Sequence, residues 1–253
     1  MKKPFRMFSE LIFPPRCVAC GKRMPVSVAH EADFFCAACE AEWQREQLRQ
    51  CPNCFSEYYR CRCQPRLLQK AGAAAFLKLA PYAEGERASV ANRVVSTMKH
   101  SPRKRPFAAA AADLSPLLSL ALQTRDAEKP LQTVLVHLPR TRRGVRKNGF
   151  DHAAYLAKEL SCALHVPYEP LLYRRHDGKE QKMLSGRERA ANVKHAFGIK
   201  QEVRGLRVVL VDDIVTTGAS VAEATRVLFA AGAAEVLVTA VCYTEKKTAR
   251  NLP

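Results

Sequence analysis

The sequence predicts an α/β protein built on a parallel β-sheet and preceded by a small cysteine-rich module. Short apolar strand patterns alternate with helical patterns from about residue 71 onward. This alternation is typical of a parallel sheet with helices on its faces. Eight of the ten cysteines lie earlier, between residues 17 and 63. We therefore expect a cysteine-rich module over residues 1–68 and an α/β domain over residues 69–253.

The cysteines of the module come in closely spaced pairs, which are Cys17 and Cys20, Cys36 and Cys39, Cys51 and Cys54, and Cys61 and Cys63. A gap of two residues lets both thiolates reach one tetrahedral ion, and eight sulfurs suffice for two closed zinc sites of four cysteines each. Closed sites have no open coordination position, so this zinc is expected to be structural. A labile redox cluster and an iron–sulfur centre are the alternatives.

Sequential pairing of the cysteines is preferred over a cross-braced arrangement, because each site then closes a shorter loop. The first site would use Cys17, Cys20, Cys36 and Cys39, and the second Cys51, Cys54, Cys61 and Cys63. Cys162 falls in a helical pattern and Cys242 in a strand pattern. Both are predicted to be small core residues.

The domain after the module shows five strand patterns and five helical patterns. The expected strands span 73–82, 134–138, 166–173, 207–212 and 235–243, and the expected helices 86–99, 107–123, 150–164, 185–195 and 219–231. The basic stretch 99–105 separates the first two helices, and the polar segment 123–130 is expected to be a loop. Ligands of such sheets bind at the carboxyl ends of the strands.

The most informative segment is 208–220, where a strand pattern is followed by polar residues and then by a helical pattern. Val208 to Val211 are apolar on both faces of a strand. Asp212 and Asp213 follow, and then the hydroxyl-rich turn 216–220, which contains Gly218. A glycine at the start of a helix lets backbone N–H groups approach an anion. The segment lacks the lysine of a triphosphate-binding loop and therefore indicates a monophosphate site.

Two adjacent carboxylates at a strand end need partners, because burying like charges side by side is costly. Ribose 2′- and 3′-hydroxyls would supply hydrogen bonds to Asp212 and Asp213. Their negative charge would also stabilise positive charge that develops on a ribose ring. Solvated aspartates at a capped turn are the alternative.

Two further segments follow predicted strands. Five of the eight residues 140–147 are basic, namely Arg140, Arg142, Arg143, Arg146 and Lys147. Clustered guanidinium groups suit a pyrophosphate or a nucleic-acid backbone, or form a solvated basic loop. The polar stretch 174–189, which includes Gln181 and Arg187, is expected to be a mobile loop over the site.

The overall charge favours polyanionic partners, since the formal net charge is +17 and the isoelectric point is about 9.7. The first six residues are basic like the start of a signal peptide, but the apolar stretch after them is too short. No segment reaches a membrane-spanning length free of charge. The sequence therefore predicts a cytoplasmic protein with no membrane span.

The segment 208–220 resembles the motif with which type I phosphoribosyltransferases bind 5-phosphoribosyl-1-pyrophosphate (PRPP) together with Mg²⁺. The resemblance implies that Asp212 and Asp213 bind the ribose hydroxyls and are catalytic in any transfer reaction. It also implies that the 5′-phosphate is held by Val215, Thr216, Thr217, Gly218, Ala219 and Ser220. The expected fold is then that of a type I phosphoribosyltransferase-like domain.

The chain as a whole resembles the ComF family. Paired cysteines, a basic segment ending Gly149-Phe150-Asp151-His152, a Gln181…Arg187 segment and the PRPP motif occur in that order. The match spans about residues 10–244. It implies a double zinc ribbon ahead of a phosphoribosyltransferase-like domain, and a link to single-stranded DNA and DNA-uptake proteins in naturally competent bacteria.

The resemblance leaves open whether the site catalyses a reaction. If it does, the reaction is phosphoribosyl transfer from PRPP to a nitrogen acceptor. Thr216 stands where hypoxanthine-type enzymes place an aspartate base, and threonine serves poorly as a base. Phe76, Tyr82, Phe107 and Phe150 are candidates for base stacking, although each is better interpreted as a core residue. We expect PRPP binding linked to single-stranded DNA handling, with enzymatic transfer as the alternative.

Overall fold

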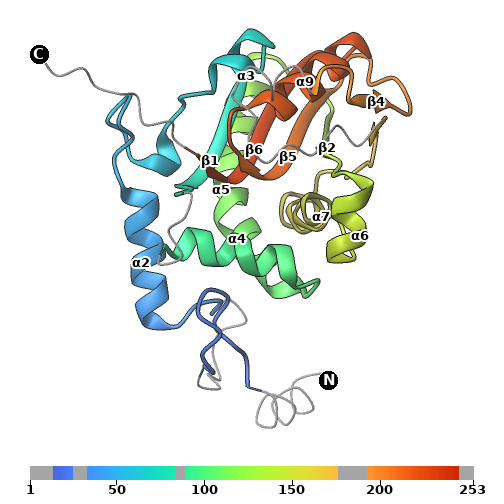
Figure 1. The fold of residues 1–253 in the computed structure, drawn as a ribbon. Helices are drawn as coiled ribbons and strands as arrows, with labels where there is room; N and C mark the ends of the chain where they lie inside the picture. Colours follow the sequence, from blue (N-terminus) through green and yellow to red (C-terminus); the bar gives the residue numbers. More distant parts are fainter. Residues whose placement is uncertain (1–13, 25–32, 84–88, 176–192, 245–253) are drawn as a thin grey trace, which may run out of the picture.

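The protein is built around a four-stranded parallel sheet in the order β1-β6-β5-β2 (Figure 1). The structure is a computed structural model that describes residues 14–24, 33–83, 89–175 and 193–244. The four strands are β1 (Ala75–Pro81), β2 (Thr133–His137), β5 (Arg207–Val215) and β6 (Glu235–Tyr243). Val208 to Val211 are fully buried, as a strand covered on both faces requires.

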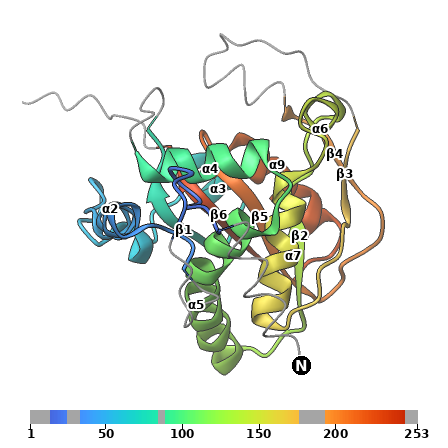
Figure 2. The same cartoon turned by 90° about the horizontal axis from the view of Figure 1, so that it is seen from below.

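One face of the sheet is covered by α4 (Val90–His100), α5 (Lys104–Glu128) and α7 (His152–Leu164). Seen from below, α5 and α7 lie side by side (Figure 2). Alternate strand residues point into this layer, among them Leu77, Leu79, Val209 and Val211. The period of two along each strand therefore assigns these side chains to one core layer.

The other face is covered by α3 (Arg66–Lys70), by α9 (Ala219–Ala230) and by an antiparallel pair of short strands, β3 (Leu172–Arg174) and β4 (Phe197–Ile199). Phe76, Val208 and Leu210 point into this second layer. Gly232 follows α9 with a φ of 90°, the left-handed conformation typical of a glycine just after a helix.

The cysteine-rich segment packs against the domain through α2 (Ala37–Leu48). Trp43 is 1% exposed, and its indole N–H donates a 2.6 Å hydrogen bond to Asp113 of α5. The carboxylate of Glu46 accepts from the backbone N–H groups of Val90 and Ala91, which begin α4. The two parts share one core cluster. The division at residue 68 stays a prediction.

Most predicted elements of the domain are confirmed, with shifts of a few residues. The predicted strands 73–82, 134–138 and 235–243 correspond to β1, β2 and β6, and the predicted helices 86–99, 150–164 and 219–231 to α4, α7 and α9. The expected loop over 123–130 is wrong, because α5 continues to Glu128. Arg125 in its last turn pairs with Glu235 and donates to the Ala74 carbonyl, and these contacts hold the extra turn.

The predicted strand 166–173 is also wrong. Tyr168 forms only an isolated parallel bridge with Leu135 of β2, and regular pairing begins again at Leu172. Pro167 and Pro170 lie in this stretch, and proline has no N–H to donate to a ladder. The predicted helix 185–195 falls mainly outside the described residues.

Two further predictions concern exposure. Cys242 is fully buried as expected, whereas Cys162 is exposed on α7, so its prediction as a core residue is wrong. Cys162 lies in a helix whose buried stripe runs through Leu156 and Leu160, and its position faces away from that stripe.

Within the described part of the chain, α5 is the one helix long and apolar enough to cross a membrane. Leu114, Leu118 and Phe107 of this helix are fully buried in the protein. Packing within the core accounts for its apolar composition.

Candidate functional site

The two carboxylates lie within β5, near its carboxyl end. The strand continues past the predicted end at residue 212 as far as Val215, and Asp212 is paired with Ala240 of β6. Each aspartate is partly buried. Asp212 Oδ1 accepts a 2.8 Å hydrogen bond from the N–H of Asp213, and Asp213 Oδ1 accepts one of 2.9 Å from Ile214. These local bonds leave the second oxygen of each side chain for other partners.

A lysine and a histidine face Asp213. Its Oδ2 lies 3.7 Å from Lys99 Nζ at the end of α4 and 3.5 Å from His152 Nδ1 at the start of α7. Burial alone would raise the pKa of this carboxyl, but the histidine contact and the lysine charge hold the pKa well below its usual range. Asp213 is therefore ionised.

Asp212 behaves in the opposite way. Burial, followed by repulsion from the ionised Asp213, raises its pKa well above the ordinary value of an aspartate. The pKa values of the two neighbouring carboxyls are therefore shifted in opposite directions. Asp213 is an anion compensated by the protein, whereas a ligand or cation that compensates the charge of Asp212 would favour its ionised form.

The ring of His152 connects the carboxylates with the basic segment. Its Nε2 accepts hydrogen bonds from Asn148 Nδ2, at 2.9 Å, and from the Arg140 guanidinium. Because Nε2 accepts from two donors, the ring proton of the neutral histidine belongs on Nδ1, facing Asp213. The backbone N–H of Arg140 is fixed by Asp151, whose carboxylate also caps α7. Arg140 is therefore positioned one side chain away from Asp213.

The turn 216–220, called the phosphate loop below, follows β5 directly. Gly218 has a φ of 78° and precedes the first residue of α9, so the loop turns in the left-handed conformation that glycine tolerates. Ala219 begins the helix, and its N–H donates a 3.4 Å hydrogen bond to Thr217 Oγ1. The positive end of a helix dipole at this terminus favours an anion. The side chains of Thr216, Thr217 and Ser220 remain partly exposed beside it. This geometry suits a phosphate group.

The segment predicted as a basic loop is largely helical. Residues Arg142–Asn148 form α6, which is capped by Thr141 Oγ1 accepting from the N–H of Gly144 and ends at Gly149 with a φ of 80°. Thr141 before the segment and Gly149 after it are typical helix-capping residues, and they indicate a helix in spite of the high charge of the segment. Arg142, Arg143, Arg146 and Lys147 are exposed on this helix.

A second basic segment lies next to α6. Asn148 Nδ2 donates a 2.9 Å hydrogen bond to the carbonyl of Lys99, so the end of α6 contacts the end of α4. Arg103, which precedes α5, and Lys104, its first residue, are exposed. We call the joined region the basic surface. It consists of Lys99, Arg103, Lys104, Arg142, Arg143, Arg146 and Lys147.

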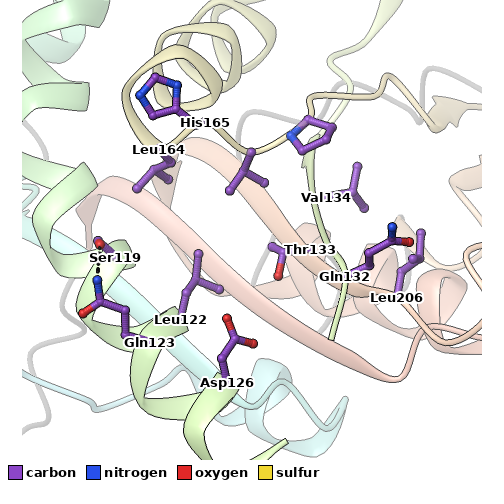
Figure 3. Close-up of a pocket in the computed structure, with 12 residues that line it drawn as sticks. Ser119, Leu122, Gln123, Asp126, Gln132, Thr133, Val134, Leu164, His165 and Leu206 are labelled. Carbon is purple, nitrogen blue, oxygen red and sulfur yellow. Dashed lines mark hydrogen bonds between the residues drawn. The ribbon is translucent and has the colours of Figure 1, made fainter. Parts of the chain in front are cut away.

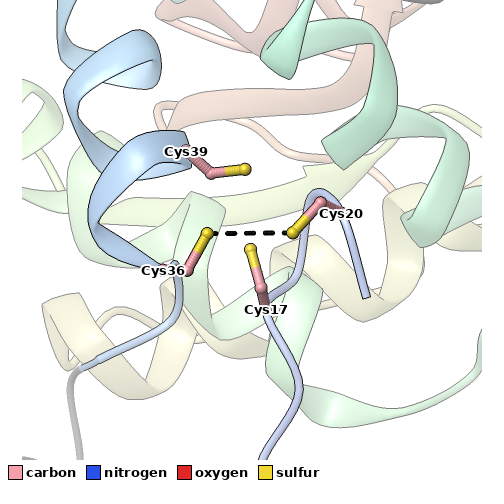
Figure 4. Close-up of side chains that lie close together, drawn as sticks. All are labelled: Cys17, Cys20, Cys36 and Cys39. Carbon is pink, nitrogen blue, oxygen red and sulfur yellow. Dashed lines mark hydrogen bonds between the residues drawn. The ribbon is translucent and has the colours of Figure 1, made fainter. Parts of the chain in front are cut away.

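The eight cysteines of the module form the two groups that sequential pairing predicted. Within each group the sulfurs lie within 4.8 Å of one another, and each group could hold a metal ion. Figure 4 shows the first group, where Cys20 Sγ and Cys36 Sγ are 3.7 Å apart. In the second group the N–H of Ser56 lowers the pKa of Cys54 to about 6. Four thiolate donors around one point fit a tetrahedral zinc ion.

The remaining predicted residues, Gln181 and Arg187, lie outside the described residues. The structure also reveals two contributors that the sequence analysis did not single out, Lys99 and His152. Both are distant in sequence from Asp213, and only the folded sheet brings them together. The Asp151-His152 pair closing the basic segment is the signal that could have pointed to one of them.

A separate pocket of about 600 Å³ lies at the opposite end of the strands, where β2 and β5 begin (Figure 3). Gln132 and Thr133 at the start of β2, His165 after α7 and Leu206 before β5 contribute to its lining. Ligands of parallel sheets bind at the carboxyl ends of strands, so this pocket is separate from the candidate site.

Opposite effects on stability are expected for the two aspartates. Asp213→Asn leaves Lys99 without its counter-ion and should lower the free energy of unfolding by about 2–3 kcal/mol. Asp212→Asn removes a repelled, buried carboxyl and should raise it by about 1 kcal/mol. Denaturant unfolding of the ligand-free protein measures both. Two changes of the same sign would contradict the assignment.

The increase in the free energy of unfolding expected for Asp212→Asn should depend on pH. A raised pKa in the folded state means that the wild-type protein loses stability as pH rises from about 4, where unfolded aspartate ionises. The difference between variant and wild type should therefore grow from about pH 4 upward and level off above the raised pKa.

Comparison with known proteins agrees with this geometry. A model of the phosphoribosyl transferase domain matches residues 144–252. The DNA utilization protein YhgH of Salmonella typhi is 31% identical over 240 residues, which cover 92% of this chain and 99% of that protein. The competence protein F of Haemophilus influenzae is 31% identical over 127 residues, which cover 47% of this chain and 56% of that protein.

Among solved structures, a hypoxanthine phosphoribosyltransferase from Staphylococcus aureus matches part of the chain. It is 11% identical, covers 59% of this chain and 68% of its own, and has a TM-score of 0.35. The phosphoribosyl transferase match, the two groups of four cysteines ahead of it and the near full-length similarity to DNA utilization proteins show that this chain belongs to the ComF family.

Proposed function

We propose that the chain binds PRPP with Mg²⁺ at the carboxyl end of β5 and has a ComF-like role in handling single-stranded DNA in the cytoplasm, together with DNA-uptake proteins. Ligand binding is best supported by one strand–turn–helix segment. Two carboxyls with opposite pKa shifts, a glycine in the left-handed conformation and a helix N-terminus follow one another along it. DNA handling is supported by the names of the relatives and by the basic surface.

Each part of PRPP has a matching group in this proposal. The 5′-phosphate binds the N–H groups and hydroxyls of the phosphate loop. The ribose hydroxyls donate to Asp212, whose ionised form they stabilise. Mg²⁺ neutralises the pyrophosphate together with Arg140, which its contact with His152 holds one side chain away from Asp213.

Replacing both carboxylates tests the ligand. Asp212→Asn combined with Asp213→Asn should abolish heat of binding for Mg²⁺-PRPP in titration calorimetry, because the acceptors of the ribose hydroxyls are lost. Glu202→Gln is a matched control, since this exposed carboxylate pairs with Arg204 away from the site. Unchanged affinity in the double variant, with native circular dichroism, would refute the ligand assignment.

The basic surface is the proposed contact for the DNA backbone. It joins two segments that are each free of acidic residues in sequence, 99–105 and 140–150. Within the basic surface, Lys99 faces Asp213 and Lys104 lies 3.5 Å from Glu159. Guanidinium and ammonium groups in such an array bind successive phosphates without reading sequence.

The aromatic residues considered for base stacking do not support a stacking site. Phe76, Phe107 and Phe150 are buried in the core, and Tyr82 is half-buried. Binding is therefore expected to follow the sugar-phosphate backbone, with weak dependence on base composition.

Charge removal on α6 tests the DNA contact. Arg142→Ala with Arg143→Ala and Arg146→Ala should weaken oligothymidylate binding in fluorescence anisotropy and reduce the log–log salt slope by about 2, because each lost phosphate contact to a single strand contributes about 0.7. Lys70→Ala with Lys129→Ala and Arg204→Ala removes equal charge from exposed positions outside the basic surface. Equal losses in both triple variants would argue against a defined surface.

Enzymatic transfer is the alternative function, as a phosphoribosyltransferase of the pentosyl class. The negative charge of Asp213, together with that of Asp212 once it is ionised, would stabilise an oxocarbenium-like ribose. Thr216 stands at the position of the aspartate base, and it is the residue that argues against purine acceptors.

A pyrophosphate-release assay separates the two functions. With Mg²⁺-PRPP and a panel of nitrogen nucleophiles, a ligand-binding protein should release pyrophosphate no faster than buffer does. Release that depends on one nucleophile and is lost in Asp212→Asn would establish the enzyme.

A further inference from the structure

The two cysteine groups contact different parts of the molecule. Around the first group, Thr97 of α4 donates a 2.9 Å hydrogen bond to the Val18 carbonyl, and an Arg93 nitrogen lies 3.9 Å from Cys39 Sγ. Both contacts are made by α4, whose last turn faces Asp213 through Lys99, and neither involves the phosphate loop. The second group instead lies against the carboxyl ends of β1 and β6.

The second group is joined to β6 through Tyr58, which lies between its cysteine pairs. Tyr58 is fully buried, and its hydroxyl donates a 3.1 Å hydrogen bond to the carbonyl of Tyr243, the last residue of β6. Tyr243 is paired in the sheet with Val215, and the N–H of Thr244 donates to the Val215 carbonyl at 2.9 Å. Val215 is the residue that immediately precedes the phosphate loop.

A second connection runs from Cys63 through Pro65. A Cβ atom on Gly218 would lie 2.6 Å from Pro65 Cβ and 3.0 Å from its Cγ, so the proline ring packs directly on the glycine of the phosphate loop. Leu68, one turn further along α3, is fully buried in the same core layer as α9. Pro65 lies only two residues after the last cysteine of the group, so its position depends on that group.

Lys78 of β1 holds the second group in place. The side chain is 1% exposed, and its Nζ donates to the carbonyls of Cys61 and Cys63, each at 3.0 Å. It also lies 3.4 Å from Cys61 Sγ. These contacts fix the backbone of Cys61 and Cys63 against β1.

We propose that the second cysteine group positions the phosphate loop, so that zinc loading there sets the affinity of the loop for a phosphoribosyl ligand. The first group has no comparable effect. Pro65 and Tyr58 are the positioning residues, and neither contacts the ligand. The affinity effect rests on the proposed PRPP binding, but the effect on the loop itself does not.

The two groups supply a matched pair of variants. Cys20→Ser and Cys54→Ser each replace an exposed second cysteine of a Cys-x-x-Cys pair, and each should reduce the zinc content to one ion per chain. Calorimetry with Mg²⁺-PRPP should show an affinity lower by about tenfold or more in Cys54→Ser than in Cys20→Ser, a difference of about 1.4 kcal/mol. Equal affinities would overturn the proposal.

Two further measurements keep the test decisive. Hydrogen exchange followed by mass spectrometry should be faster for residues 214–220 in Cys54→Ser than in Cys20→Ser, and this readout needs no ligand. Equal exchange would overturn the proposal. If wild-type protein binds no PRPP, the proposed function fails, and the exchange result alone decides the positioning role.

Tyr58→Phe covers the case in which Cys54→Ser does not fold. This variant keeps all eight cysteines and should keep two zinc ions, yet it loses the hydrogen bond to Tyr243. Exchange at residues 214–220 should still be faster than in wild type. Wild-type exchange and wild-type PRPP affinity in this variant would contradict positioning through Tyr58.

Discussion

The buried carboxylate of Asp213 has to be compensated, and its compensation organises the carboxyl edge of the sheet. Lys99 of α4 and His152 of α7 both face one oxygen of this side chain. His152 in turn fixes Arg140 and accepts from Asn148, which joins α6 to α4. The proposed ribose site, the arginine proposed to bind the pyrophosphate and the basic surface are therefore parts of one electrostatic network. Removing its central charge would affect all three.

The same network explains why two neighbouring aspartates are not equivalent. Lys99 and His152 lower the pKa of Asp213, whereas burial and repulsion from Asp213 raise the pKa of Asp212. In the proposed function, a ribose ligand with its cation binds at Asp212, where the protein itself provides no compensating charge. The phosphate loop beyond them is held from the other side, where Pro65 packs on Gly218. The cysteine-rich module is thus structurally continuous with the proposed ligand site.

Local patterns in the sequence predicted the central strand Val208–Val211, helix α9 and both cysteine groups, because each depends on residues close together in the chain. The sequence did not reveal the partners of Asp213, since Lys99 and His152 approach it only in the folded sheet. Charge obscured the capping signals of α6, and two prolines interrupted the strand expected over 166–173. Cys162 was misplaced because a helical pattern alone does not say which face a small residue occupies.

The central claim is that the end of β5 binds a phosphoribosyl group, and a crystal structure of the zinc-loaded chain with Mg²⁺-PRPP tests it most directly. The account predicts the 5′-phosphate against the N–H groups of residues 216–220, the ribose hydroxyls on Asp212, and Asp213 still facing Lys99 and His152. A ligand bound elsewhere, or a phosphate loop left empty at saturating PRPP, would contradict it.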